Sequence, residues 1–197
     1  MSVRALMLCG DFAEDYEVMV PFQALQAFGV RVDAICPGKK TGERIATAIH
    51  DFTHFQTYVE TRGHDFVLNA SFDDIDPGAY DALIVPGGRA AEYLRMQPRV
   101  VELVTKMFEQ GKVISAICHG VQLLTGLKIV SGHRVTAYPA MKPEIEAAGG
   151  TWADQGLEGV CIDGKIITAP AWPAHPSFIR ALVSALGISV QLPGKGE

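Results

Sequence analysis

The sequence of 197 residues contains few charged residues and no long apolar run. Its 17 Lys and Arg are outnumbered by 22 Asp and Glu, and the net charge of -5 argues against nucleic acid or an anionic membrane surface as a partner. No apolar run approaches the ~18 residues that a membrane-spanning helix needs. The first residues lead directly into a strand-like run with no basic segment before it, so we expect no signal peptide.

Cysteine is also scarce, with four residues that are widely spaced and form no CxxC pair. This spacing indicates neither a disulfide framework nor a zinc site, and it is typical of a protein of the reducing cytoplasm. His50 and His54 could share one helical face as a metal pair. No third ligand follows at a suitable spacing, so we predict surface or interface histidines and no metal.

What the sequence does contain is an alternation of strands and helices. Strands are expected at residues 3–9, 30–36, 81–85, 113–117 and 130–136 and in a hairpin at 160–168, and helices at 14–28, 98–110, 142–148 and 176–186. This pattern predicts a doubly wound α/β fold, with a mostly parallel sheet sandwiched by helices. We expect a single domain over residues 2–192, followed by a polar tail over 193–197.

Residues 39–69 interrupt this alternation with a mixture of lysines, histidines and aromatic residues. We expect an irregular excursion with one or two short strands. Such a segment could act as a substrate lid, as a subunit contact or simply as a satellite layer packed on the main sheet.

The most informative stretch surrounds Cys118. An apolar run over 113–117 precedes it, helical spacing begins at Val121, and the small residues Ala116 and Gly120 flank it. A strand, a sharp turn and a helix form a nucleophile elbow, where only small residues fit beside the nucleophile. The helix N-terminus would lower the pKa of the thiol and favour the reactive thiolate. The alternative is an inert, buried cysteine at a strand end.

Several other candidates follow strand ends and would gather at the same edge of the sheet. The main-chain N–H groups of His119, Gly87 and Gly88 could hold developing oxyanion charge, although the two glycines could equally form a simple loop turn. Glu14 and Glu17 share a helix face, and one that faces the thiol would have a raised pKa and could move a proton. Alternatively, these acidic residues only complement the helix dipole, which is all that we expect of Asp15.

His119 could act as a base if its ring reaches the sulfur or a substrate, although neighbours in sequence need not face each other at a sharp turn. It would also need a carboxylate to orient it, and the spacing of the sequence alone identifies none.

Three motifs together resemble the DJ-one/ThiJ/PfpI superfamily: Ala-Glu-Asp-Tyr-Glu at 13–17, Pro-Gly-Gly-Arg-Ala at 86–90 and Ala-Ile-Cys-His-Gly at 116–120. The resemblance covers nearly the whole chain and is greatest to the plant-type glutathione-independent glyoxalases (glyoxalase III). Segments such as Cys-Pro-Gly-Lys-Lys at 36–40 and His-Pro-Ser-Phe-Ile at 175–179 match that branch. Those plant proteins carry two such domains in tandem, whereas this chain has one.

The resemblance implies a flavodoxin-like fold and a set of site residues. Cys118 would be the nucleophile, Glu17 the general acid/base beside its sulfur, and His119 a second base. Glu92 would reach a neighbouring subunit and orient the histidine there, in a homo-oligomer that is a dimer or a hexamer. Ala91 stands where this motif commonly has proline, but the change leaves Glu92 in place.

The resemblance also implies an activity that requires no metal or cofactor. The thiolate would add to methylglyoxal to form a hemithioacetal, which rearranges and is released as lactate; glyoxal would give glycolate. Two alternatives stay open: a cysteine peptidase or deglycase of the PfpI type, and a redox-sensing stress protein or chaperone.

Overall fold

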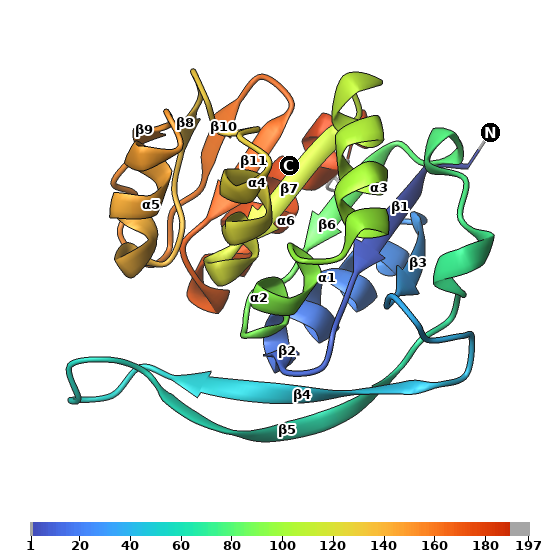
Figure 1. The fold of residues 1–197 in the computed structure, drawn as a ribbon, viewed down its shortest axis with the longest axis horizontal. Helices are drawn as coiled ribbons and strands as arrows, with labels where there is room; N and C mark the ends of the chain where they lie inside the picture. Colours follow the sequence, from blue (N-terminus) through green and yellow to red (C-terminus); the bar gives the residue numbers. More distant parts are fainter. Residues whose placement is uncertain (1, 190–197) are drawn as a thin grey trace, which may run out of the picture.

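A computed structural model describes residues 2–189; the predicted tail over 193–197 lies outside the described residues. Six strands form the central sheet in the order β10-β11-β7-β6-β1-β3 (Figure 1). Their bounds are β1 Arg4–Leu8, β3 Arg31–Ile35, β6 Ala82–Val85, β7 Val113–Ile117, β10 Cys161–Asp163 and β11 Ile166–Ala169. All neighbours pair in parallel except β10 and β11, which confirms the predicted doubly wound, flavodoxin-like sheet.

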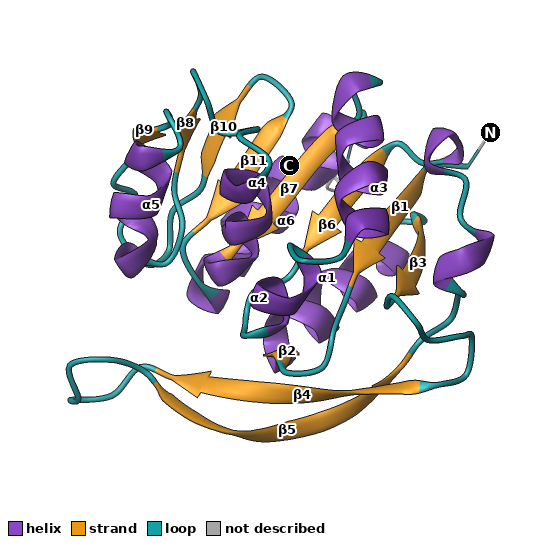
Figure 2. Ribbon diagram, in the orientation of Figure 1, coloured by secondary structure: helices purple, strands orange, loops and turns teal. Residues whose placement is uncertain are grey.

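Helices cover both faces of this sheet (Figure 2). They are α1 Asp15–Ala27, α2 Ala90–Leu94, α3 Pro98–Glu109, α4 Val121–Gly126, α5 Lys142–Ala147 and α6 His175–Ala185. Helices α1 and α6 contact each other on one face, while α3 and α4 pack on β7 from the other. The short α2 was not predicted, because five residues are too few to show a helical period.

The central strands are readable in the sequence because both of their faces are covered. Every residue of β6, β7 and β11 is buried, as are all but the first of β1 and β3. Strands buried on both faces read as continuous apolar runs. Glycines then mark the helix ends as predicted, since Gly29 (φ 79°) and Gly111 (φ 66°) adopt the left-handed conformation that ends a helix.

Residues 39–69 do not form an irregular excursion with short strands; that expectation is wrong. Strands β4 (Arg44–Asp51) and β5 (Val59–Val67) form a long antiparallel hairpin, which β2 (Ala13–Glu14) extends on one side. Figure 1 shows this hairpin as a separate layer that runs along one edge of the body. A bulge between Ala46 and Ala48, together with buried polar residues, breaks the alternation that would have revealed the strands.

The remaining elements are small. Strands β8 (Arg134–Val135) and β9 (Thr151–Trp152) pair beside α5, and short 3₁₀ turns occur at Phe72–Asp74, Pro77–Ala79, Cys118–Gly120, Pro139–Met141 and Trp172–Ala174. Within residues 2–189, every helix is too short or too polar to cross a lipid bilayer.

Candidate functional site

The predicted sharp turn follows β7, at the carboxyl edge of the sheet. Cys118 adopts φ 56°, in the left-handed region that residues other than glycine seldom occupy. Such strain costs about 1–2 kcal/mol and is concentrated at functional sites. A Cβ at Gly120 would lie 2.4 Å from the carbonyl oxygen of Val85, so only glycine lets the turn pass β6.

Glu17 lies against this turn and is fully buried. Its Oε2 accepts the N–H of Gly87 at 2.8 Å, while Oε1 has no hydrogen-bond partner among residues 2–189. A Cβ at Gly87 would lie 2.4 Å from Glu17 Oε2 and 2.6 Å from Cys118 Cβ. The N–H of Gly87 is therefore occupied in holding the carboxyl group, and its missing side chain lets Glu17 and Cys118 approach each other.

The protonation of this pair differs in part from expectation. Burial, and then the charge of Glu14, raise the pKa of Glu17 well above its usual range, as predicted for a carboxyl group facing the thiol. Burial and the charge of Glu17 also raise the pKa of Cys118, although the main-chain N–H groups of His119 and Gly88 oppose this. The predicted lowering of this pKa is wrong, because burial and the carboxyl group of Glu17 outweigh the main-chain N–H groups at the turn.

His119 does reach the sulfur, a question that the sequence left open. Its Nδ1 lies 3.3 Å from Cys118 Sγ. Burial and the neighbouring His50 lower the pKa of His119 to about 4, so the ring is neutral at pH 7 and can accept a proton. The charge of Glu144, whose carboxylate pairs with Arg95 at 3.1 Å, opposes this shift. Glu144 could not be identified from the sequence, because α5 approaches α4 only through the tertiary fold.

Glu14 forms the N-cap of α1 and does not share a helix face with Glu17. Its carboxylate accepts the N–H groups of Glu17 at 2.8 Å and His50 at 3.3 Å. Burial raises its pKa to about 7. Glu14 thus joins the start of α1 to strand β4 and places a second acidic group beside the Glu17–Cys118 pair.

Asp15 is more than a helix-dipole residue, so the expectation for it is wrong. It is buried, and it accepts hydrogen bonds from the Thr47 hydroxyl and from the main-chain N–H of His64 at 2.9 Å. These partners belong to β4 and β5. Asp15 therefore fastens the hairpin to the helix that carries Glu17, a role that depends on a layer missing from the sequence-based prediction.

Aromatic rings from three segments cover the elbow. Tyr138 stacks on His119 at 5.0 Å between ring centroids, and Tyr58 meets the same histidine edge-on at 5.8 Å. Phe52, from the end of β4, stacks between Tyr138 at 6.2 Å and Trp172 at 5.8 Å. Cys118 is consequently only 2% exposed. These rings could not be identified from the sequence, because they come from residues 52–58, 138 and 172 and no local pattern relates them.

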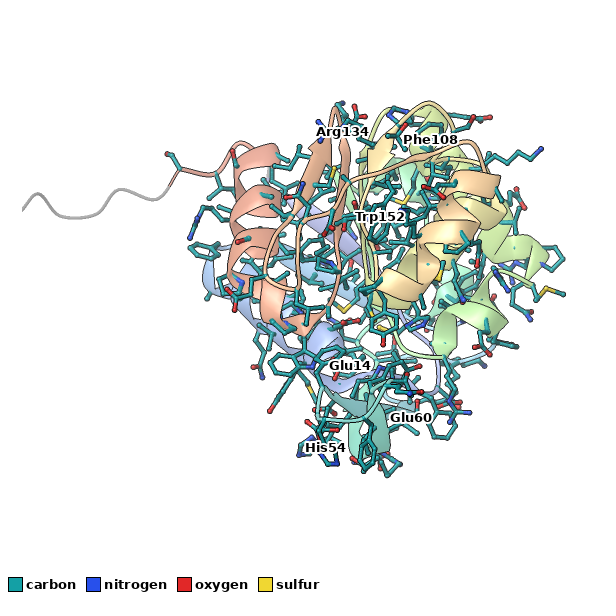
Figure 3. All side chains as sticks on the ribbon, turned by 90° about the vertical axis from the view of Figure 1, so that its left-hand side faces the viewer. Glu14, His54, Glu60, Phe108, Arg134 and Trp152 are labelled. Atoms are coloured by element: carbon teal, nitrogen blue, oxygen red, sulfur yellow. The ribbon has the colours of Figure 1, made fainter. Side chains whose placement is uncertain are left out.

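His50 is buried in this cover and is not a surface or interface histidine as predicted. Its ring stacks on Tyr58 at 4.1 Å, and its Nε2 lies 3.0 Å from Glu60, which also pairs with Arg89 at 2.9 Å. The indole of Trp172 donates to the carbonyl of His50 at 2.8 Å. Figure 3 shows that Glu14, Glu60 and His54 lie at one end of the molecule, opposite Arg134 and Phe108.

Two of the predicted site residues remain, Gly88 and Glu92, and only Gly88 lies at the elbow. Gly88 (φ 77°) directs its N–H toward Cys118, and a Cβ there would lie 2.3 Å from the carbonyl oxygen of Phe12. Glu92 is exposed on α2, and its side chain makes no hydrogen bond or ion pair within residues 2–189. It lines a separate cavity of about 360 Å³ together with Phe12 and Arg89. The structure thus brings together Cys118, Glu17, His119, Gly87, Gly88 and Glu14, but not Glu92.

Comparison with known proteins gives one consistent family. The DJ-1/PfpI family model matches residues 3–185. Protein DJ-1 homolog D of Arabidopsis thaliana is 52% identical over 94% of this chain and 48% of its own length, so the chain spans about half of that relative. A deglycase of Pyrococcus abyssi is 32% identical over 93% of this chain and 99% of its own length.

Solved structures agree on the fold. DJ-1beta of Drosophila melanogaster superposes with a TM-score of 0.74 at 20% identity and covers 96% of this chain and 100% of its own. DJ-1 of Schizosaccharomyces pombe gives a TM-score of 0.75 at 19% identity, over 97% of this chain and 100% of its own. Since the family model spans nearly all of the sequence and a full-length archaeal relative aligns with it, the chain belongs to the DJ-1/PfpI family.

Proposed function

We propose that the protein is a cofactor-independent glyoxalase that converts methylglyoxal to lactate, and glyoxal to glycolate. The observation that carries this proposal is the placement of two proton-transfer groups at one thiol: the Nδ1 of neutral His119 lies 3.3 Å from Cys118 Sγ, and Glu17 is buried beside it. An isomerisation of a 2-oxoaldehyde needs a nucleophile and a group that removes and returns a proton.

In the first step, Cys118 adds to the aldehyde carbon. His119, which is neutral at pH 7 and lies 3.3 Å from the sulfur, accepts the thiol proton as the carbon–sulfur bond forms. The protonated ring then gives this proton to the aldehyde oxygen, which completes the hemithioacetal and returns His119 to its neutral form. The N–H groups of His119 and Gly88 already point toward the sulfur, which suits them to hold the developing negative charge on that oxygen.

In the second step, a proton moves from C1 to C2 of the bound substrate. The raised pKa of Glu17 makes it a carboxyl group that can both take a proton from carbon and return one, through an enediol-like state. The product of this transfer is a lactoyl thioester on Cys118. Water hydrolyses the thioester, which releases lactate and restores the thiol.

A deglycase of early methylglyoxal adducts is the second candidate. It is favoured by the 32% identity to the deglycase of Pyrococcus abyssi over almost the full length of both chains. The same thiol would then attack an adduct on an amine or thiol instead of the free aldehyde. The cover formed by Tyr58, Phe52 and Tyr138 over the elbow argues for the smaller substrate.

The decisive experiment measures lactate formed from methylglyoxal without glutathione. We expect Cys118→Ala to reduce the rate by at least ~10³-fold and Glu17→Gln by ~10²–10⁴-fold. Cys161→Ala is the matched control, because this buried cysteine contacts the carbonyl of Arg134 on β8, outside the site. Full activity in Cys118→Ala would refute the proposal.

A second arm separates the two candidates. A preformed methylglyoxal adduct of N-acetylarginine is incubated with the protein while a scavenger removes free methylglyoxal. A glyoxalase leaves the adduct to decay at its spontaneous rate, whereas a deglycase accelerates the decay in a manner that depends on Cys118.

We also propose that the protein acts as a homo-oligomer in the cytoplasm. Glu92 supports the first part, because it is an exposed carboxylate on α2, next to the loop that carries Gly87 and Gly88. The four cysteines, all of them free thiols, support a reducing compartment.

A further inference from the structure

Two cysteines that the proposed reaction does not use lie side by side in the sheet. Cys9 directly follows β1 and Cys36 directly follows β3, and the last register pair of these parallel strands is Leu8 with Ile35. The N–H of Cys9 donates to the carbonyl of Ile35 at 2.8 Å. The strand pairing therefore continues one residue further, and Cys9 and Cys36 occupy its next position.

This position suits a covalent link between the two sulfurs. Neighbouring strands lie about 4.7–4.9 Å apart, and disulfides join residues whose Cα atoms are about 4.4–6.8 Å apart. Residues at one register position project from the same face of a sheet, so the two thiols face the same side. The charge of Cys36 also raises the pKa of Cys9, after the larger effect of burial, which agrees with their proximity.

Both cysteines are buried, but Cys36, which is 3% exposed, borders a cavity and Cys9 does not. Cys36 lines the cavity of about 360 Å³ that also contains Lys39, Arg89 and Tyr93. Cys9 is fully buried behind it. A small oxidant in the cavity would therefore meet Cys36 first, and Cys9 would be the thiol that resolves the product.

We propose that Cys9 and Cys36 form a reversible disulfide when the protein reacts with a hydroperoxide. The Cys36 thiolate attacks the peroxide oxygen, the O–O bond breaks, and an alcohol or water leaves as the sulfenic acid forms. The Cys9 thiol then attacks that sulfur, and water leaves with the disulfide in place. Two thiols are oxidised by two electrons and one peroxide is reduced.

The reaction is expected to be slow at neutral pH and faster in alkali. Burial raises the pKa of Cys36 to about 11, although Lys39 opposes the shift, so the thiolate fraction grows as the pH rises toward that value. The disulfide would join the ends of β1 and β3 immediately before the loop that leads to Glu14. Oxidation would therefore stiffen one wall of the proposed site without touching Cys118.

The test treats the full chain carrying Cys118→Ser with hydrogen peroxide, so that the elbow cysteine cannot react. Intact mass spectrometry should show the loss of two hydrogens, and non-reducing peptide mapping should join the peptides that contain Cys9 and Cys36. Dithiothreitol should reverse both changes. Adding Cys36→Ser should abolish the link, whereas adding Cys161→Ser should leave it intact.

Three outcomes would overturn the proposal. They are two alkylatable thiols at Cys9 and Cys36 after oxidation, sulfinic acid on Cys36 with Cys9 unmodified, and a link that joins either residue to Cys161. The map of the parent chain decides between these outcomes by itself, so the test holds even if a serine variant fails to fold. None of the outcomes depends on glyoxalase activity.

Discussion

Gly87 shows how a single missing side chain shapes the site. Its N–H orients Glu17, and the space where its Cβ would stand is taken by Glu17 and Cys118. A carboxyl group and a thiol can thus lie together in a buried place, which raises the pKa of both. The glycine thus acts on the chemistry in two ways, through the close approach that it allows and through the hydrogen bond that it donates to Glu17.

Gly87→Ala should therefore reduce activity strongly while the protein still folds. The added methyl group would meet main-chain and short side-chain atoms at 2.4–3.0 Å, which have little freedom to move. We expect a loss of about 1–3 kcal/mol in the free energy of unfolding and a fall in kcat/KM of at least ~10²-fold.

Urea unfolding and initial rates check the two parts of this prediction. Gly126→Ala is the control, since its Cβ would meet only Arg95 at 3.9 Å, within the last turn of α4. A Gly87→Ala variant with normal activity would show that the spacing of Glu17 and Cys118 is not critical.

At the scale of single elements, α6 begins with a histidine that has lost its hydration. His175 is buried, its Nε2 has no hydrogen-bond partner among residues 2–189, and burial lowers its pKa to about 4. The unfolded chain binds this proton near pH 6.5. Its contribution to stability is thus complete above pH 6.5 and is lost as the pH falls through 4.

His175→Gln should make the free energy of unfolding less sensitive to acid. Between pH 7 and pH 4 the wild type should lose up to about 3 kcal/mol more in free energy of unfolding than the variant. Urea titrations at the two pH values give this difference. His54→Gln serves as the control, because this exposed side chain keeps its hydration in the folded state; equal acid losses in His175→Gln and wild type would contradict the explanation.

The elements differ in how far the sequence could predict them. The strand before Cys118 could be predicted, because a buried parallel strand is a continuous apolar run. The small residue after Cys118 could be predicted too, because the turn beside β6 leaves no room for a Cβ at Gly120. The hairpin could not be predicted, since its inner face buries Thr47 and His50 among the apolar residues. Asp15 was misjudged for the same reason, because its partners lie on that hairpin.

On the scale of the whole molecule, the site lies where two layers meet. The central sheet supplies Cys118 and His119, while the hairpin supplies Tyr58 and Phe52 as a cover. Spacing in the sequence could indicate the first layer but not the rings of the second. Nor could it find Glu144 on α5, whose charge opposes the lowered pKa of His119.

Glu92 gives the prediction for the assembled molecule. If a second copy brings Glu92 to His119, the carboxylate raises the pKa of that histidine. Glu92→Gln should then lower kcat by about tenfold or more and shift the acid limb of the pH–rate profile to lower pH. Rates across pH, together with light scattering, measure activity and mass on one sample.

The matched control is Glu102→Gln, an exposed carboxylate on α3. A chain of 21.2 kDa that remains monomeric while fully active would contradict the role of Glu92.

Because aromatic rings cover Cys118, the reactivity of its thiol depends on how often the end of the hairpin moves away. The middle of the hairpin is held to the body by the pairing of β4 with β2, by Asp15 and by the buried residues Ile45 and Phe66, while its end is held by side chains that include Trp172. Lifting its end disrupts far fewer contacts than global unfolding, so openings of this kind occur while the rest of the chain stays folded. The rate at which a thiol reagent labels Cys118 should then measure the opening equilibrium of the hairpin end.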